Sequence, residues 1–322
     1  MEIKVKTSLE LSQEEWESYV VGFNQVFSKS HSVDMFLHKY LNTIDSFSYH
    51  SLLYNEGNIV GGCTVIPFNY VIKGQLVRVG LAVDVFICEK FRIDIFALLK
   101  LYKKIKEKLI NHNISIVVAV PNDVSYRYWK SVVKWKDIGQ LNYYVYPLNF
   151  GNLVNKYPPF LNFVSRSCLS FFLLLFRYYN ITQKRVPIFI SRNDEVIYKH
   201  RYTIEHKLFT GDDYFASYRL IDENGIKACY LIDFYNLSNG LKDFQSIRKF
   251  IIHVRKTEHV DVIIFVGILS FFQCLLFKVP RKFEPKHLYF TIDILIPNII
   301  KDDDLIYNVN NWDFGLFNYD VR

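Results

Sequence analysis

The segment Leu81–Asn122 restricts the possible folds of this chain more than any other part of the sequence. It begins with a run of strand-forming residues, Leu81–Ile87, passes through a short polar turn and enters an amphipathic helical pattern near Ile95. A second apolar run, Ile114–Val120, follows and ends at a proline and an asparagine. We expect a strand, a loop, a helix about four or five turns long and a second strand. The loop suits an anionic group, because unpaired N–H groups and the positive end of the helix dipole meet there.

Length and composition indicate a folded protein with two domains. At 322 residues the chain exceeds the usual size of one domain, and half of its residues are apolar while 17% are aromatic. This composition excludes a largely disordered chain. The net charge of +7 fits an anionic ligand or nucleic acid, and it fits an ordinary basic protein equally well. The first residues are charged and lack the apolar core of a signal peptide, so we expect a cytoplasmic protein.

The cysteines and histidines do not follow the spacing of a metal site or of a disulfide framework. The cysteines are odd in number and scattered, and no two of the interior histidines are spaced like zinc ligands. The residues concerned are Cys63, Cys88, Cys168, Cys229, Cys274, His50, His200, His206, His253 and His287. We therefore expect no metal site and a reducing compartment. Motifs of serine hydrolases and of nucleotide-binding loops do not occur in the sequence either.

The residues before the central segment predict two helices and then an antiparallel sheet. Ser12 and Glu15 have capping-box spacing at the start of the first helix, and a second helical pattern covers about 33–41. The period of the apolar residues then changes to two. Residues 49–54 and 59–66 predict a β-hairpin, and further strands lead into the central segment.

Asp84 is a carboxylate on the otherwise apolar strand predicted at Leu81–Ile87. Because side chains alternate between the two faces of a strand, Asp84 shares its face with Ala82 and Phe86. Two interpretations remain open. Asp84 is either a base that takes a proton from a substrate, or a structural aspartate satisfied by the backbone or by a lysine.

The segment Cys168–Phe176 is apolar on all sides and lies between Arg166 and Arg177. It is too short to span a bilayer, which requires ~20 apolar residues, so we expect no stable membrane insertion. We expect a buried helix that connects two domains. A helix that lies on a membrane surface is the alternative.

The last third of the chain repeats the order of elements in the first. Residues 214–221 and 226–234 predict a second hairpin, which is followed by a helix at about 243–256 and a buried strand at 260–266. A strand pair near 138–148 would close the first domain. The repeated order predicts two copies of one fold, although the similarity lies in pattern and not in residue identity.

The loop after the central strand resembles that of the GNAT (GCN5-related N-acetyltransferase) superfamily. That family has a loop of the form [R/Q]-x-x-G-x-[G/A] between a central strand and the next helix, where backbone amides hold the pyrophosphate of coenzyme A. The matching residues are Arg92, Ile93, Asp94, Ile95, Phe96 and Ala97. Arg92 and Ala97 fit the pattern. Ile95 stands where the family prefers glycine, which lets a phosphate approach the backbone.

A second landmark of the family follows the next strand. The family has an asparagine there, a small residue three positions later and an aromatic residue four positions beyond, which Asn122, Ser125 and Trp129 match. In many members the aromatic residue is a tyrosine that protonates the leaving thiolate. An indole N–H is not an acid in the relevant pH range, so Trp129 does not fit this role. Tyr126 and Tyr128 lie close by in the sequence and are the candidates for it.

The resemblance implies a mechanism that needs few side chains. A backbone amide of the central strand, at Val85 or Ile87, would polarise the thioester carbonyl of acetyl-CoA or another acyl-CoA. Asp84 would take the proton from the amine of a small acceptor.

The resemblance also implies the domain organisation and the function. We expect an α/β (α+β) protein with two tandem GNAT-like domains, each a mixed, mostly antiparallel sheet flanked by helices. Residues 1–150 would bind acyl-CoA, 151–190 would connect the domains, and 191–322 would form a degenerate second domain. The predicted function is transfer of an acyl group from acetyl-CoA or another acyl-CoA to the amine of a small acceptor. The alternatives are a binding protein without catalysis and an aminoacyl-tRNA-dependent transferase, which only the lysine-rich helix near 95–109 supports. DNA is not an expected partner.

Overall fold

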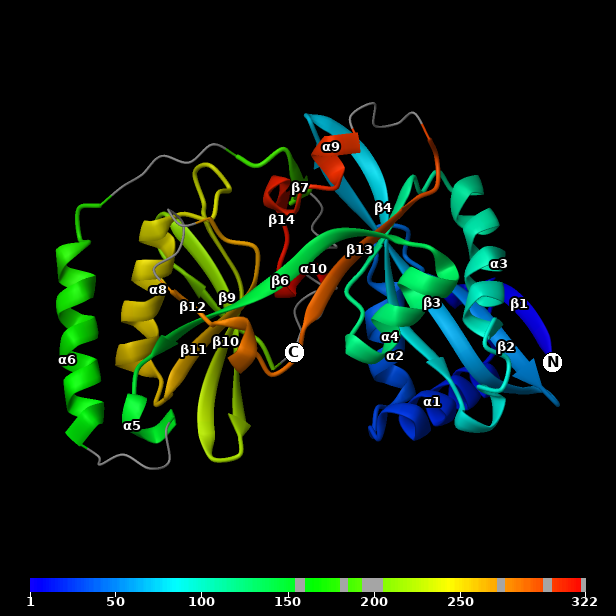
Figure 1. Ribbon diagram of the computed structural model, residues 1–322, viewed down its shortest axis with the longest axis horizontal. Helices are drawn as coiled ribbons and strands as arrows, with labels where there is room; N and C mark the ends of the chain where they lie inside the picture. The colour runs from blue at the N-terminus through cyan, green and yellow to red at the C-terminus, as the bar shows by residue number, and fades with distance from the viewer. Residues whose placement is uncertain (154–159, 180–184, 193–204, 271–275, 298–302, 320–322) are drawn as a thin grey trace. The chain divides into compact units, whose positions relative to one another are not determined.

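The structure is a computed structural model that describes residues 1–153, 160–179, 185–192, 205–270, 276–297 and 303–319. The chain divides into two compact units, each assembled from segments that are distant in sequence (Figure 1). Unit 1 comprises Met1–Gln140 with the described residues of Pro187–Arg201 and Leu288–Asn311; unit 2 comprises Leu141–Val186, Tyr202–His287 and Trp312–Arg322, again as far as they are described. The expected boundaries at 1–150, 151–190 and 191–322 are contiguous and therefore differ from these units.

Unit 1 contains a mixed sheet in which one pair of neighbouring strands is parallel and the other pairs are antiparallel. The strand order is β1-β2-β3-β4-β5-β13, with β7 paired to β3, and only β4 and β5 are parallel to one another. The strands are β1 Glu2–Thr7, β2 Tyr49–Asn55, β3 Asn58–Ile72, β4 Gln75–Ile87, β5 Ile116–Ala119, β7 Ile188–Ile190 and β13 Leu288–Ile294. Because β13 pairs with β5, a segment from the last part of the chain completes the first sheet.

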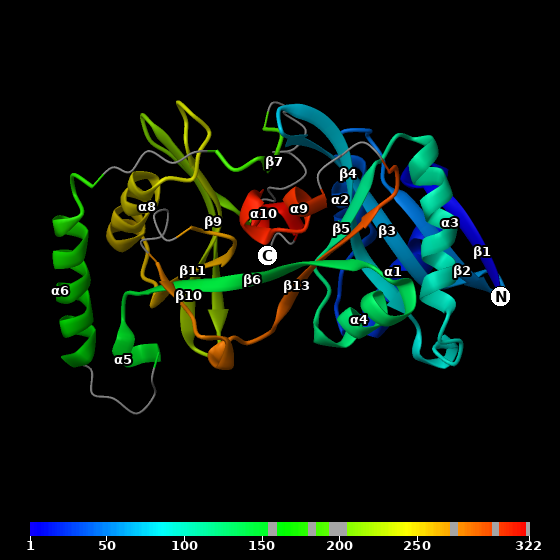
Figure 2. The same ribbon diagram turned by 45° about the horizontal axis from the view of Figure 1, so that its top comes forward.

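The helices of unit 1 cover both faces of this sheet. They are α1 Gln13–Phe27, α2 Val33–Leu41, α3 Ala97–Asn111, α4 Asp123–Tyr128 with a π-helical turn at Trp129–Val133, and α9 Asp303–Ile306. On β2, Tyr49 contacts His112 at the end of α3, whereas the next residue, His50, contacts Trp16 of α1. Since consecutive strand residues point to opposite faces, α3 packs on one face and α1 on the other, as Figure 2 shows.

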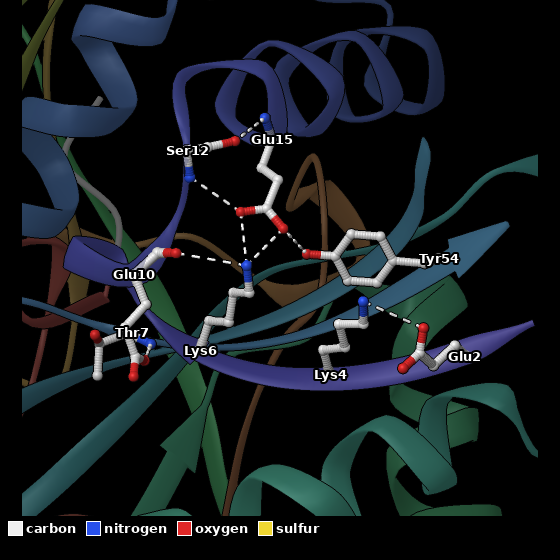
Figure 3. Close-up of polar contacts among 8 residues, drawn as sticks. All are labelled: Glu2, Lys4, Lys6, Thr7, Glu10, Ser12, Glu15 and Tyr54. Carbon is white, nitrogen blue, oxygen red and sulfur yellow. Dashed lines mark hydrogen bonds and ion pairs between the residues drawn. The ribbon is translucent and has the colours of Figure 1, made fainter. Parts of the chain in front are cut away.

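The start of α1 confirms the predicted capping box. The Ser12 hydroxyl accepts a hydrogen bond from the Glu15 amide at 3.2 Å, and the Glu15 carboxylate accepts one from the Ser12 amide at 3.0 Å (Figure 3). Each side chain satisfies an amide that has no partner within the helix.

The lysine-rich helix α3 buries its apolar side, including Leu101, Ile105 and Leu109. Several of its lysines form ion pairs within unit 1, at 2.7 Å from Lys100 to Asp94, 2.9 Å from Lys106 to Asp293 and 3.0 Å from Lys108 to Glu10. These pairs favour a helix face with a structural role over a surface for tRNA.

Unit 2 repeats the order of antiparallel hairpin, helix and parallel strand. Its strand order is β6-β11-β10-β9-β8, with β12 paired to β6, and only β10 and β11 are parallel. The strands are β6 Lys136–Pro147, β8 Lys207–Thr210, β9 Tyr214–Glu223, β10 Ile226–Asn236, β11 Val262–Gly267, β12 Phe277–Lys278 and β14 Trp312–Asp313. The helices are α5 Phe150–Leu153, α6 Phe160–Leu175, α8 Phe244–Thr257 and α10 Leu316–Tyr319. The hairpin, helix and strand expected in the last third are confirmed.

The strand pair expected near 138–148 is wrong, because a single strand, β6, runs through these residues. Buried residues recur along its length, and no turn interrupts the strand. Its first residues, up to Gln140, belong to unit 1, and the remainder pairs with β11 in unit 2.

Helix α6 is only partly buried, which corrects the expectation of a buried connecting helix at Cys168–Phe176. Leu169 and Leu173 belong to the core of unit 2, whereas Phe171 and Leu174 are exposed. One face of α6 packs on the core of unit 2, and the opposite face is apolar but exposed among the described residues. Among the described helices, none has the length and hydrophobicity needed to cross a lipid bilayer.

Candidate active site

Strands β4 and β5 separate after a short parallel contact. They pair only from Val79 with Ile116 to Leu81 with Val118, although β4 continues to Ile87. Beyond Leu81, β4 remains paired with β3 on its other side. One edge of β4 therefore has no strand partner among the described residues, and its backbone groups are available to a ligand.

The open edge of β4 carries the amides of Val85 and Ile87. The Cys88 amide donates to Val60 of β3 at 2.8 Å, so it faces the paired side of the strand. Because backbone groups alternate in direction along a strand, the amides of Ile87 and Val85 face the open side. The Ile87 carbonyl on that side accepts a hydrogen bond from Arg92 Nε at 2.8 Å.

A β-bulge lies at Asp84 on the same strand. Gly62 pairs with Phe86 and Thr64 pairs with Val83, so two steps along β3 correspond to three along β4. The extra residue gives Asp84 a φ of 50°, a left-handed conformation that aspartate tolerates better than most side chains. Bulges redirect a side chain locally, and this one points a carboxylate at α1 and α2.

The Asp84 carboxylate has two partners on one oxygen. Tyr40 donates its hydroxyl proton to Oδ2, and Lys39 forms an ion pair with the same atom. Within the described part of the chain, no group donates to Oδ1. Both interpretations of Asp84 thus keep support: a lysine satisfies it, and one oxygen remains available for chemistry.

Asp84 also borders a small hollow of about 80 Å³. The other residues that line it are Phe23, His31, Met35, Phe36 and Lys39. Sequence reasoning missed His31 and Lys39 as site residues. The signal was the i, i+4 spacing of Met35 with Lys39 and of Phe36 with Tyr40, which puts these pairs on one side of α2.

Burial shifts the pKa values of the titratable groups around Asp84. Burial raises the pKa of Tyr40 well above its ordinary value, and the negative charge of Asp84 raises it further. Burial lowers the pKa of His31, while the charge of Asp84 opposes this shift. At neutral pH, Tyr40 is therefore a stable proton donor to the carboxylate.

The loop at 92–96 precedes α3, which begins at Ala97 and not near Ile95. The Asp94 carboxylate accepts from the Phe96 amide at 2.9 Å and pairs with Lys100 at 2.7 Å. The hydrogen bond from Lys100, and then that from the Phe96 amide, lower the pKa of Asp94. The amides of Ile93 and Ile95 have no acceptor among the described residues. The loop thus offers amides to an anion, but it also holds an acid that Lys100 neutralises.

Ile95 does not need the conformational freedom of glycine. None of the residues 92–97 has a positive φ. The Ile95 side chain is 57% exposed, and that of Ile93 is 90% exposed. The family's glycine is therefore missing without local strain, and only the bulk of the Ile95 side chain affects the approach of a ligand.

Asn122 and Ser125 cap the short helix α4. Asn122 Oδ1 accepts from the Ser125 amide at 2.9 Å and from the Ser125 hydroxyl at 3.0 Å. Trp129 is only 2% exposed, and its ring packs against Trp135 and Tyr102 with centroids 4.4 and 5.7 Å away. The spacing of these three residues therefore has a structural explanation in capping and packing.

The two candidate tyrosines have different surroundings. The Tyr126 hydroxyl lies 3.0 Å from both Asp137 and Lys130, and its ring stacks on Tyr289 at 3.6 Å. Burial and then the charge of Asp94 raise the pKa of Tyr128. Tyr128 is thus within electrostatic reach of the loop, whereas the Tyr126 hydroxyl has two other partners.

A metal centre has no support in the described residues, where no three His, Cys, Asp or Glu side chains gather to hold an ion. His200 and Cys274 lie outside the described residues.

Comparison with known proteins finds similarity in structure and not in sequence. No protein-family model and no curated protein sequence matches this chain. A GCN5-related N-acetyltransferase from Anabaena variabilis covers 91% of this chain and 73% of its own at 16% identity, with a TM-score of 0.59. A GCN5-related N-acetyltransferase from Kribbella flavida covers 91% and 72% at 9% identity, with a TM-score of 0.57. The Saccharomyces cerevisiae N-myristoyltransferase with bound myristoyl-CoA covers 90% and 82% at 11% identity, with a TM-score of 0.55.

The chain has the GNAT fold. This confirms the fold expected from the motif at Arg92–Ala97, and the mixed sheets flanked by helices confirm the expected fold class. At such low identity, the GNAT fold is what the similarity establishes.

Proposed function

We propose that this protein is an N-acyltransferase that moves an acyl group from acyl-CoA to the amine of a small molecule. The separation of β4 from β5 after Leu81 carries the proposal. The amide groups in the pantetheine arm of coenzyme A can pair with the open edge of β4 at Val85 and Ile87, as an added strand would. The GNAT-fold neighbours include a GCN5-related N-acetyltransferase and a myristoyl-CoA complex of an N-myristoyltransferase, which supports an acyl-CoA donor. Acetyl-CoA is the simplest such donor.

The loop Arg92–Ala97 is the proposed pyrophosphate site. The amides of Ile93 and Ile95 are available, and α3, 15 residues long, directs its positive end to the same loop. Arg92 adds a positive charge that is exposed beside the open edge of β4. Lys100 offsets the charge of Asp94, so the loop does not repel a phosphate as strongly as a free carboxylate would.

Asp84, Val85 and Tyr128 supply the proposed chemistry. Asp84 Oδ1 takes a proton from the acceptor ammonium, and the free amine attacks the thioester carbonyl. The Val85 amide stabilises the oxyanion of the tetrahedral intermediate. The C–S bond then breaks, and Tyr128 gives its proton to the departing thiolate of coenzyme A. The nitrogen, which is positively charged after the attack, loses its second proton to water, and Tyr128 is protonated again from water. The products are an amide and free coenzyme A.

The hollow beside Asp84 is the proposed acceptor site. Its aromatic and apolar lining by Phe23, Met35 and Phe36 fits a small amine with an apolar part, which places the amine next to the carboxylate. We propose a cytoplasmic location, in keeping with the free cysteines Cys63, Cys88, Cys168 and Cys229.

Calorimetry with acetyl-CoA tests cofactor binding. We expect micromolar or tighter affinity, and we expect Arg92→Glu to weaken it at least tenfold because the new carboxylate repels phosphate. Lys256→Glu is the matched control, since it makes the same charge change on an exposed residue of α8 in unit 2. No detectable heat at millimolar acetyl-CoA would exclude the proposal. Binding without transfer to any amine would identify a binding protein instead.

A further inference from the structure

A continuous series of hydrogen bonds leads from the interior of unit 1 to Asp84. From the interior outward, its members are Ser8, His50, Thr64, Tyr19, Tyr40 and Asp84. The four contacts from Ser8 to Tyr40 measure 2.9, 2.9, 3.1 and 3.0 Å. The first five residues are at most 3% exposed. Water therefore does not supply alternative partners. The carbonyl oxygens of Ser48 and Tyr40 lie 3.3 and 3.5 Å from Ser8 Oγ, farther than His50 Nε2 at 2.9 Å.

The number of protons fixes the direction of the outer bonds when Asp84 is ionised. A carboxylate only accepts, so the single proton of Tyr40 points to Asp84. The contact between Tyr40 and Tyr19 then needs the proton of Tyr19. For the same reason, the contact between Tyr19 and Thr64 needs the proton of Thr64.

The same reasoning fixes the tautomer of His50. Because Thr64 has already used its proton, the contact between Thr64 Oγ1 and His50 Nδ1 requires a proton on Nδ1. Burial lowers the pKa of His50 to about 3, so the ring is neutral at physiological pH and Nε2 carries no proton. Ser8 then donates to Nε2, while its oxygen accepts from the Ser48 amide at 3.0 Å.

We propose that Ser8, His50, Thr64, Tyr19 and Tyr40 form a one-way series of proton donors that ends on Asp84 and fixes the orientation and charge of its carboxylate. All five dipoles point the same way, and aligned hydrogen bonds strengthen one another in a low-dielectric interior. These are positioning residues, since only Asp84 faces the proposed substrate. The order of the protons does not depend on the proposed reaction, but its consequence for the rate does.

The arrangement assigns different tasks to the two oxygens of Asp84. Oδ2 is held by Tyr40 and Lys39, which leaves Oδ1 as the atom that takes a proton. The charged or titratable groups that act on Asp84 come from every element around it. They are Lys39 and Tyr40 of α2, Tyr19 of α1, His31 before α2 and His50 of β2. Removing the series leaves Lys39 as the remaining donor to Oδ2.

If the series served only to stabilise the core, it would not need hydroxyl and imidazole groups. Buried hydroxyl and imidazole groups must be desolvated, and apolar residues of similar volume fill a core at lower cost. Positioning the Asp84 carboxylate at the β-bulge, by contrast, requires a series of polar groups that ends on it.

The nitrogen NMR spectrum of the His50 ring tests the order of protons directly. In the ¹⁵N-labelled full chain, with the His50 signals assigned by their loss in His50→Gln, we expect a neutral ring protonated on Nδ1 at pH 7. In Tyr40→Phe the proton of Tyr19 is released from its contact with Tyr40, so we expect the Nε2-protonated tautomer to appear. Asp84→Asn tests the same coupling if Tyr40→Phe does not fold. An Nε2-protonated ring in the native protein would overturn the proposal.

Tyr49→Phe is the matched control for the NMR experiment. Tyr49 is a buried tyrosine of β2 next to His50, but its hydroxyl donates to Asp45 at 2.9 Å, outside the series. We expect the tautomer of His50 to be unchanged in Tyr49→Phe. An equal change in Tyr49→Phe and Tyr40→Phe would contradict the one-way series.

The pH profile of acyl transfer tests the functional consequence. In Thr64→Val, an isosteric change that interrupts the series, we expect the acidic limb of kcat/KM to move to higher pH with little change in KM for acetyl-CoA. An unchanged acidic limb would show that the series does not act through Asp84. Absence of any transfer would reject the proposed function and leave the NMR result as the test of the proton order.

Discussion

Glu15 is a single carboxylate that joins three elements of unit 1. It lies 2.6 Å from Lys6 of β1 and accepts from Tyr54 of β2 at 2.7 Å, while it caps α1 through the Ser12 amide (Figure 3). Partial burial acts to raise the pKa of Glu15, but hydrogen bonds from Lys6, Ser12 and Tyr54 outweigh it and lower the pKa. Nearby, the backbone hydrogen bond from Thr7 lowers the pKa of Glu10 to about 2.

These shifts predict an acid dependence of stability. A carboxylate with a depressed pKa in the folded state stabilises the protein above its unfolded pKa, and this contribution is lost as the pH falls through the folded pKa. We therefore expect Glu15→Gln to lower the free energy of unfolding by about 1 kcal/mol at pH 7. The difference from the native protein should shrink as the pH falls below the ordinary pKa of a glutamate, about 4.3, toward the lower pKa of folded Glu15.

Urea unfolding between pH 3 and pH 7 measures this effect, with Glu14→Gln on the exposed side of α1 as the control. A difference between Glu15→Gln and the native protein that stays constant over this range would contradict the account of Glu15.

Tyr128 and Tyr126 allow a matched test of the proton donor. We expect Tyr128→Phe to lower kcat by about 10²-fold, because the thiolate then leaves without a proton. Tyr126→Phe should leave kcat within a few-fold, since the Tyr126 hydroxyl is bonded to Asp137 and Lys130. Steady-state kinetics with acetyl-CoA decides between them, and equal effects of the two changes would remove Tyr128 from the mechanism.

At the scale of elements, α6 combines two environments in neighbouring residues. Leu173 is 3% exposed and Leu174 is 60% exposed. The apolar run at 168–176 predicted a helix but not its exposed side, because a helix that is apolar all round carries no signal of which side is covered. Tertiary contacts with the core of unit 2, through Leu169 and Leu173, decide this.

This pair gives a direct stability test of α6. We expect Leu173→Ala to lower the free energy of unfolding of unit 2 by about 2–5 kcal/mol, because it leaves a cavity. Leu174→Ala should change it by less than about 0.5 kcal/mol, as for most surface positions. Chemical denaturation monitored by circular dichroism compares the two variants. Similar losses in both would show that the exposed side of α6 is covered.

At the scale of the whole molecule, both units contain a pair of parallel strands that separate, and among the described residues only unit 1 leaves the edge beyond the separation open. In unit 2, β10 and β11 pair from Ala228 to Tyr230, and a bulge follows at Ile232. The chain at 312–319 occupies this region: the Phe314 carbonyl accepts from the Ile268 amide at 2.8 Å, and α10 contacts both strands. We infer that cofactor binding is confined to unit 1.

The sequence predicted the elements well because hairpins and amphipathic helices have local signals. It also placed Asp84 on its strand and the loop at Arg92–Ala97 before a helix. It could not show the interleaving of the units, because the pairing of β13 with β5 depends on contacts between residues far apart in sequence. The bulge at Asp84 and the hydrogen bonds from His50 depend on tertiary contacts in the same way. Single residues such as Trp129 matched a motif by spacing and proved to be core residues.

Hydrogen–deuterium exchange with and without acetyl-CoA tests most directly whether the open edge of β4 is the cofactor site. At saturating acetyl-CoA, we expect slower exchange of the amides at 82–87 and 93–97 in unit 1. The corresponding strand of unit 2, at 231–236, should exchange at an unchanged rate. Slower exchange at 231–236 without protection of 82–87, or no protection in either unit, would contradict an acyl-CoA site in unit 1.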